Sequence, residues 1–160
     1  MAVDMFLKLD GVKGESKDKA HTQDIDIISW SWGMSNSGSA HQGSGAGSGK
    51  VNVQDVSITK YIDSSSAKLM LSCCDGAHFS SALLTVRKAG GTKLVEYVKI
   101  KMEEVLITSL STGGCGQDDR LTENIGLNFA KVTVEYVPQS DKGDPGKMMP
   151  FSWDIAANHK

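Results

Sequence analysis

The nine residues Asp24-Ile25-Asp26-Ile27-Ile28-Ser29-Trp30-Ser31-Trp32 alternate largely between apolar and polar side chains, and this period of two predicts a β-strand. One face of the strand carries Ile28, Trp30 and Trp32. Burying one tryptophan removes roughly 150–250 Å² from water, so we expect this face to be buried. The opposite face begins with isoleucine and becomes polar at Ser29 and Ser31, which predicts that this part of it meets water.

Three later stretches keep the period of two but change phase part-way along. The apolar positions change from odd to even at Gln54-Asp55 within residues 51–58, and similar changes occur within residues 94–110 and 127–136. A β-bulge, or a corner between two sheets, changes the pattern in this way. Three long strands of this kind favour a mainly β fold, a small β-barrel of two antiparallel sheets, and closure of a barrel removes exposed strand edges.

Shorter elements complete the predicted barrel. Residues 3–10 alternate as a strand, residues 82–88 form another that ends in a turn at residues 89–91, and residues 151–155 form a last short strand. One outer α-helix is predicted from the spacing i, i+3, i+4 and i+7 of four small or apolar residues. These residues, which define its apolar face, are Ala67, Met70, Leu71 and Cys74.

Both ends of the predicted helix carry capping residues. The serines Ser64, Ser65 and Ser66 offer N-cap candidates, and Gly76 suits the position just after the last turn. A long Gly/Ser-rich loop lies elsewhere, between two strands, at residues 38–50. Loops of this length inside a compact domain are uncommon and usually functional or mobile. A second Gly-rich segment covers residues 111–119.

Composition limits the partners. The 160 residues fit a single domain (residues 1–160), and 17 basic against 19 acidic side chains leave a net charge of -2. This balance gives no argument for a nucleic-acid partner or for membrane insertion, and no apolar run approaches the roughly 18 residues of a membrane-spanning helix.

Asp4 and Lys8 interrupt the N-terminal apolar residues, so no cleavable signal peptide is expected and the chain is expected to fold in the cytoplasm. Cys73, Cys74 and Cys115 are an odd set, interpreted as free thiols.

The residues offer no pattern for catalysis, a metal or a cofactor. The glycine run before Lys50 resembles a phosphate loop, but Ser44 and Val51 stand where that motif requires glycine and Ser/Thr, and a strand follows instead of a helix. The four histidines are scattered without metal-ligand spacing; they are His21, His41, His78 and His159. The sequence shows no recognisable spacing between Cys115 and a general base that could activate its thiol. We therefore predict a protein that acts by contact.

Motifs along nearly the whole chain together resemble the haemolysin-coregulated protein (Hcp) family, the tube subunit of the type VI secretion system. In order they are Met5-Phe6-Leu7-Lys8-Leu9 with Gly14-Glu15-Ser16, Ser29-Trp30-Ser31-Trp32-Gly33, Lys50-Val51-Asn52-Val53-Gln54-Asp55-Val56, Thr59-Lys60-Tyr61-Ile62-Asp63, Leu84-Thr85-Val86-Arg87-Lys88-Ala89-Gly90, Glu104-Val105-Leu106-Ile107, and Glu123-Asn124-Ile125 with Leu127-Asn128-Phe129. Each motif alone is weak, and the ordered set is specific. Ser65-Ser66-Ala67 lacks the proline often found at the start of the family's helix, and the tail at residues 138–160 is a variable region from which no role is inferred.

The resemblance implies a homohexameric ring with a wide pore. Rings would stack into a tube that a contracting sheath drives out of the cell behind a spike protein, so the protein would be cytoplasmic first and then secreted. Small effector proteins would be bound and protected in the pore, with Ser29 and Ser31 on its lining. The loop implied to reach the next ring contains Gly38, His41, Gly43, Gly45, Gly47, Gly49 and Lys50.

Two other functions remain open from the sequence. One is a secreted carrier of the same fold that is not built into long tubes. The other is an enzyme, which the missing nucleophile–base pair and the absence of a catalytic extension beyond the tube domain argue against.

Overall fold

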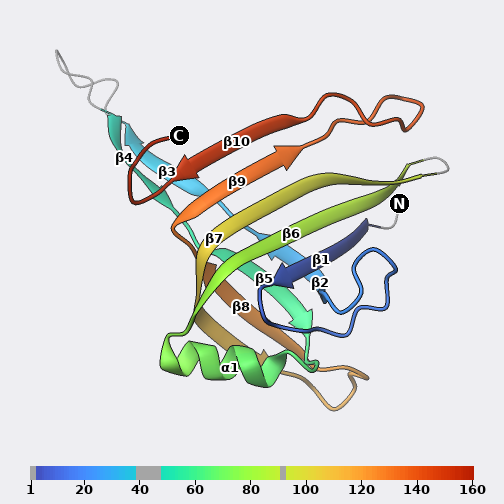
Figure 1. Ribbon diagram of the computed structural model, residues 1–160. Helices are drawn as coiled ribbons and strands as arrows, with labels where there is room; N and C mark the ends of the chain where they lie inside the picture. Colours follow the sequence, from blue (N-terminus) through green and yellow to red (C-terminus); the bar gives the residue numbers. More distant parts are fainter. Residues whose placement is uncertain (1–2, 39–47, 91–92) are drawn as a thin grey trace.

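The computed structural model describes residues 3–38, 48–90 and 93–160 (Figure 1). The elements are β1 (Val3–Leu9), β2 (Ile25–Ser31), β3 (Met34–Gly38), β4 (Ser48–Val53), β5 (Val56–Tyr61), α1 (Ser66–Asp75), β6 (His78–Gly90), β7 (Lys93–Gly113), β8 (Thr122–Asn128), β9 (Lys131–Tyr136) and β10 (Met149–Asp154). The predicted strand at residues 82–88 is therefore longer at both ends, and the predicted last strand begins two residues earlier. Position 91 of the predicted turn lies outside the described residues.

The eight-stranded antiparallel sheet closes on itself. Its order is β10-β9-β7-β6-β1-β2-β5-β8, and a further pairing of β7 with β8 joins six of these strands into a barrel. β9 and β10 extend the sheet beyond the barrel, and β3 pairs with β4 in a separate two-stranded sheet, called the arm below. Figure 1 shows the arm projecting from the barrel as the continuation of β2 and β5. The prediction of a mainly β barrel with one outer helix is confirmed.

Inward-facing apolar side chains fill the barrel. The fully buried residues come from strands all round it and include Leu7, Ile25, Ile58, Leu84 and Met102. Burying apolar surface is the main favourable contribution to folding, at about 25 cal/mol per Å². The core therefore fixes which face of each strand points outward.

The structure of β2 differs from the prediction of which of its two faces is buried. Ile25 and Ile27 are buried and Ile28 is 38% exposed, because a register shift between residues 27 and 29 moves the following side chains to opposite faces. Beyond this bulge, Trp30 packs against the core as predicted, and Ser29 lies exposed on the outer face.

Only one of the three phase changes lies inside a single strand. β7 covers residues 93–113, and its Glu104 adopts a left-handed backbone with φ of 53° at the phase change. In the other two cases the chain leaves one strand and begins another: β4 ends before Gln54-Asp55 and β5 begins after it, and β8 and β9 are separated by residues 129–130. The prediction of three continuous strands was wrong in these two places, since a break changes the phase as a bulge does.

The helix α1 lies where it was predicted, but its expected apolar face points outward. Leu69 and Ser72 are buried, whereas Leu71 is 61% exposed. Gly76 ends the helix with φ of 70°, as predicted for a left-handed C-terminal residue. The N-cap residue Ser65 makes no capping bond with its side chain. Its hydroxyl instead donates to Asp63, inside a buried polar network described below.

Candidate functional site

Two neighbouring rows of residues on the outer face of four strands contain no charged side chain, and Asp55 lies beside them, where it accepts hydrogen bonds from Thr108 and Asn128. The strand registers align Ser29, Thr59, Asn124 and Ser111 in one row across β2, β5, β8 and β7. A parallel row contains Ser31, Ser57, Gly126 and Ser109. These eight residues are called the hydroxyl face. The structure thus brings Ser29 and Ser31 together with residues that are far away in the sequence. Strand pairing positions these residues, and no local sequence motif indicates that they lie together.

The hydroxyl face offers hydrogen-bonding groups to solvent. Ser29, Ser31 and Ser57 are exposed, and the Thr59 hydroxyl donates to Asn124 Oδ1 at 2.7 Å. A Cβ at Gly126 would lie 2.5 Å from Ser109 Oγ, so glycine leaves room for that hydroxyl. Hydroxyl groups both donate and accept, so such a face forms weak contacts with many polar surfaces.

The arm continues from one edge of this face. β3 and β4 pair from Met34↔Val53 to Gly38↔Ser48, and Asn36 Nδ2 donates to the Gly49 carbonyl at 2.8 Å. A Cβ at Gly49 would collide with the Ser37 hydroxyl, which explains a glycine there.

The predicted loop at residues 38–50 overlaps the arm at both ends, because the chain pairs as strand up to Gly38 and again from Ser48. Gly49 and Lys50 therefore belong to β4. The predicted stacking residues His41, Gly43, Gly45 and Gly47 lie outside the described residues.

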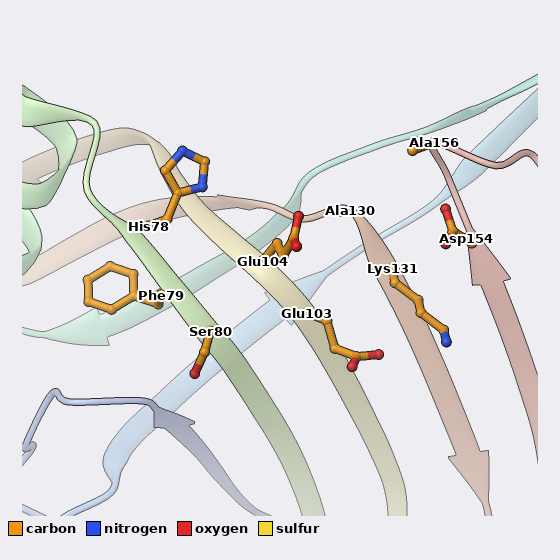
Figure 2. Close-up of a pocket in the computed structure, with 9 residues that line it drawn as sticks. All are labelled: His78, Phe79, Ser80, Glu103, Glu104, Ala130, Lys131, Asp154 and Ala156. Atoms are coloured by element: carbon orange, nitrogen blue, oxygen red, sulfur yellow. The ribbon is translucent and has the colours of Figure 1, made fainter.

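A hollow of about 800 Å³ lies at the end of the barrel where β6 begins (Figure 2). Figure 2 shows Glu103 on β7 beside Lys131 on β9, with Asp154 of β10 beyond it, and the strand registers align these three residues. Opposite charges on neighbouring strands stabilise a sheet modestly. Sequence reasoning did not identify this hollow. Among the described residues, no group of three or more His, Cys, Asp or Glu side chains could hold a metal ion.

Ionic contacts hold the segment between β1 and β2 (residues 10–24) against the barrel. Arg87 donates to Asp18 Oδ2 at 2.5 Å and to Asp4 Oδ2 at 3.0 Å, and its guanidinium lies 5.0 Å from the centre of the Phe6 ring. The hydrogen bond from Arg87 holds the pKa of the Asp18 carboxyl well below its usual range. The hydrogen bond to Asp18 likewise raises the pKa of Arg87.

His21 joins the same segment to β7. Its ring nitrogens lie 2.8 Å from Asp24 Oδ2 and 3.0 Å from Glu96 Oε1, and the ring stacks on Phe6 with centroids 4.2 Å apart. Burial raises the pKa of Glu96, but hydrogen bonds from Lys99 and His21 outweigh burial and lower that pKa. His21 thus has a structural role that its isolated position in the sequence does not indicate.

A second polar network is fully buried beneath the start of α1. Lys60 Nζ lies 2.5 Å from Glu123 Oε1 and 2.8 Å from Asp63 Oδ1, and neither Lys60 nor Glu123 has exposed side-chain surface. The Ser66 hydroxyl donates to Glu123 Oε1 at 2.6 Å. The network therefore ties α1 to β5 and β8.

The cysteines are free thiols, as predicted. Cys73 is half-buried on α1, and Cys74 and Cys115 are exposed. The backbone N–H of Cys115 donates to Asp118 Oδ2 in the turn after β7. In the described part of the chain, no helix is both long and apolar enough to cross a membrane.

Comparisons with known proteins agree along the whole chain. The family model described as type VI secretion system effector, Hcp, matches residues 6–136. Protein hcp1 of Pseudomonas aeruginosa is 60% identical over 159 residues, which cover 99% of this chain and 98% of that protein. The crystal structure of Hcp1 from Salmonella typhimurium is 34% identical with a TM-score of 0.83 and covers 99% of both chains. A structure described as a type six secretion system protein is 32% identical with a TM-score of 0.91 and covers 98% of both.

These matches first define a class, the secreted proteins of type VI secretion systems. Within that class, the chain belongs to the Hcp family. The resemblance inferred from the ordered motifs is thus confirmed.

Proposed function

We propose that this chain is the inner-tube subunit of a type VI secretion system. Six copies form a ring around a pore, rings stack into a tube, and a surrounding sheath expels the tube with a spike protein at its tip. The protein is cytoplasmic before this event and leaves the cell without a cleavable signal. Membership of the Hcp family supports this assembly.

The hydroxyl face supports a second part of the proposal, which is that the pore carries effector proteins. An exposed strand face without charged side chains holds polar cargo through weak hydrogen bonds and releases it again, because no single contact is strong. Ser31 lies in one of the two rows of this face and is the residue on which we test cargo binding.

The ring is tested by the native mass in solution. Six subunits of 17.1 kDa give about 103 kDa, measured by light scattering on a gel-filtered sample, and electron micrographs of that peak should show open rings. A stable 17.1 kDa monomer at all concentrations would contradict both the ring and the pore.

Cargo binding is tested by replacing Ser31 with a longer side chain. Ser31→Gln should leave the native mass unchanged and lower the amount of effector that co-purifies with the ring, because the amide side chain projects from the pore lining. Ser152→Gln on β10 serves as the matched control, since Ser152 lies outside the hydroxyl face. Equal effector recovery from Ser31→Gln and from the control would count against Ser31 as a cargo contact.

A further inference from the structure

Phe6 is buried on the outer face of the barrel instead of in its core. Leu7 packs in the core, so its neighbour Phe6 points outward, and Phe6 pairs in register with the exposed residue Asp26. Phe6 is nevertheless only 5% exposed. The ring of His21 stacks on the Phe6 ring with centroids 4.2 Å apart and planes 8° from parallel. The segment that carries His21, between β1 and β2, therefore covers this aromatic side chain.

A carboxylate faces each of the two ring nitrogens of His21. Nδ1 lies 2.8 Å from Asp24 Oδ2, and Nε2 lies 3.0 Å from Glu96 Oε1. An ionised carboxylate only accepts hydrogen bonds, and a neutral imidazole has one donor and one acceptor. A neutral His21 would therefore turn a lone pair toward one of the two carboxylates. Only the imidazolium, which carries a proton on both nitrogens, satisfies both contacts.

The two carboxylates differ in how far they depend on His21. Lys99 Nζ lies 2.7 Å from Glu96 Oε2, so Glu96 keeps a cationic partner without His21. In the described part of the chain, the Asp24 carboxylate has no side-chain partner except His21, and its side chain is only 12% exposed. Loss of the imidazolium charge would leave Asp24 as a mostly buried charge without a partner, which is unfavourable.

The remaining charges near His21 form an anchor that does not respond to pH in the neutral range. The backbone N–H of His21 donates to Asp18 Oδ1 at 3.2 Å, and Arg87 donates to both Asp18 and Asp4. Arginine stays protonated in proteins, and its hydrogen bond holds the pKa of Asp18 well below its usual range. Near neutral pH, only the contacts of the His21 ring can therefore change with protonation in this cluster.

We propose that residues 19–24 form a pH-dependent latch over Phe6. In the closed state, the His21 imidazolium bridges Asp24 and Glu96, and its ring covers Phe6. As the pH rises, His21 loses one ring proton to solvent, one of the two bridges breaks, and the segment loosens and exposes Phe6. Because the double bridge requires the imidazolium, its stabilisation is present in mild acid and is lost toward alkaline pH. The latch operates within a single subunit and does not depend on the proposed ring.

Hydrogen–deuterium exchange of the unmodified full-length protein tests the latch. Labelling times at each pH are scaled for the intrinsic pH dependence of amide exchange. The protection of residues 19–24 should fall about tenfold or more between pH 6 and pH 9, the size expected for losing one hydrogen bond to a charged group. The protection of residues 98–106 in the core of the barrel should stay constant. Hydroxyl-radical footprinting over the same pH range should show increasing oxidation of Phe6.

Two substitutions assign the effect to His21. His21→Gln offers donors and an acceptor that do not change with pH, so residues 19–24 should be weakly protected at every pH. His78→Gln is the matched control, since His78 is exposed and pairs with Leu106, far along β7 from Glu96. This control should lose protection between pH 6 and pH 9 as the unmodified protein does.

Constant protection of residues 19–24 from pH 6 to pH 9 in the unmodified protein would overturn the latch. A pH dependence that persists in His21→Gln would overturn it as well, because another group would then be responsible. If His21→Gln also loses protection at residues 98–106, the substitution has unfolded the barrel. The unmodified protein then decides, and Phe6 oxidation that does not change with pH would reject the latch.

Discussion

Lys60 and Glu123 form an ion pair without exposed surface, and each depends on the other. Glu123 Oε2 has no hydrogen-bond partner, so the charge of this carboxylate is balanced through its other oxygen alone. Removing one member of a buried pair leaves an uncompensated charge, which costs about 3–5 kcal/mol. Replacing both members with apolar residues of similar size is often far less costly.

We therefore expect Lys60→Met to lower the free energy of unfolding by about 3–5 kcal/mol. The double variant Lys60→Met/Glu123→Leu should recover part of this loss, because the fully buried carboxylate is then removed as well. The recovery is incomplete, because Asp63 has also lost its contact with Lys60. Urea unfolding at one fixed protein concentration measures both values. A double variant less stable than the single variant would contradict the account.

Asp18 predicts how stability depends on pH. Its hydrogen bond from Arg87 lowers its pKa in the folded protein, so the unfolded chain binds the proton more tightly. The stabilisation is therefore present above the ordinary aspartate pKa of about 3.9 and is lost as the pH falls below it.

We expect Asp18→Asn to unfold more easily than the unmodified protein at pH 7, and the difference to shrink as the pH falls toward 3. Unfolding midpoints measured from pH 7 to 3 test this expectation. Asp26→Asn is a suitable control, since Asp26 lies exposed on β2. A difference that stays constant with pH would show that the Asp18 charge is not the cause.

At the scale of elements, α1 shows what a helical pattern leaves undecided. The apolar spacing of Ala67, Met70, Leu71 and Cys74 predicts a helix correctly and its buried face wrongly. The hydroxyl of Ser66 binds Glu123, and Leu69, three residues later on the same side of the helix, packs against the core.

Leu69→Ala should therefore lower the free energy of unfolding by about 2–5 kcal/mol, because it opens a cavity in the core. Leu71→Ala should change it by no more than about 0.5 kcal/mol, as expected for an exposed position. Chemical unfolding of the two variants compares the faces directly. Equal losses would contradict the orientation of the helix.

The strands show the same limit of sequence patterns. Alternation identifies most of the barrel strands and the exposure of Ser29 and Ser31, since it depends only on neighbouring residues. The alignment of Ser29 with Ser111 depends on pairings among four strands from distant parts of the chain, so it is not visible in any local stretch. The bulge after Ile27 was missed because an isoleucine occupies the extra position and resembles a buried residue.

At the scale of the whole molecule, the arm forms a sheet of its own beside the barrel and contacts it through side chains, since Val53 of β4 packs against the core. Among the described residues, β3 and β4 pair only with each other, so shortening the chain between them at residues 39–47 should leave the barrel unchanged. Under the proposed function, the segment at residues 39–47 contacts the next ring in the stack.

We expect replacement of residues 39–47 by Asn-Gly, a pair favoured in tight hairpins, to preserve the ring and abolish stacking. Light scattering measures the ring, and electron microscopy at high protein concentration measures tube length. A control that exchanges the same nine residues for a Gly/Ser segment of equal length separates the effect of length from that of sequence. Tubes of normal length in the shortened variant would remove this segment from the stacking contact.

The closed order of the barrel also determines when the chain can fold. β1 pairs with β6 from Val3↔Lys88 onward, and β5 pairs with β8 at Val56↔Leu127. Contacts between distant residues form slowly, because long loops must close first. During synthesis, β1, β2 and β5 can pair with one another, but the barrel cannot close until β6 and β8 have left the ribosome, and Trp32 lacks its neighbour Phe129 until then. A newly made chain is thus most vulnerable to aggregation just before its residue 128 emerges, which is where a chaperone would protect it most.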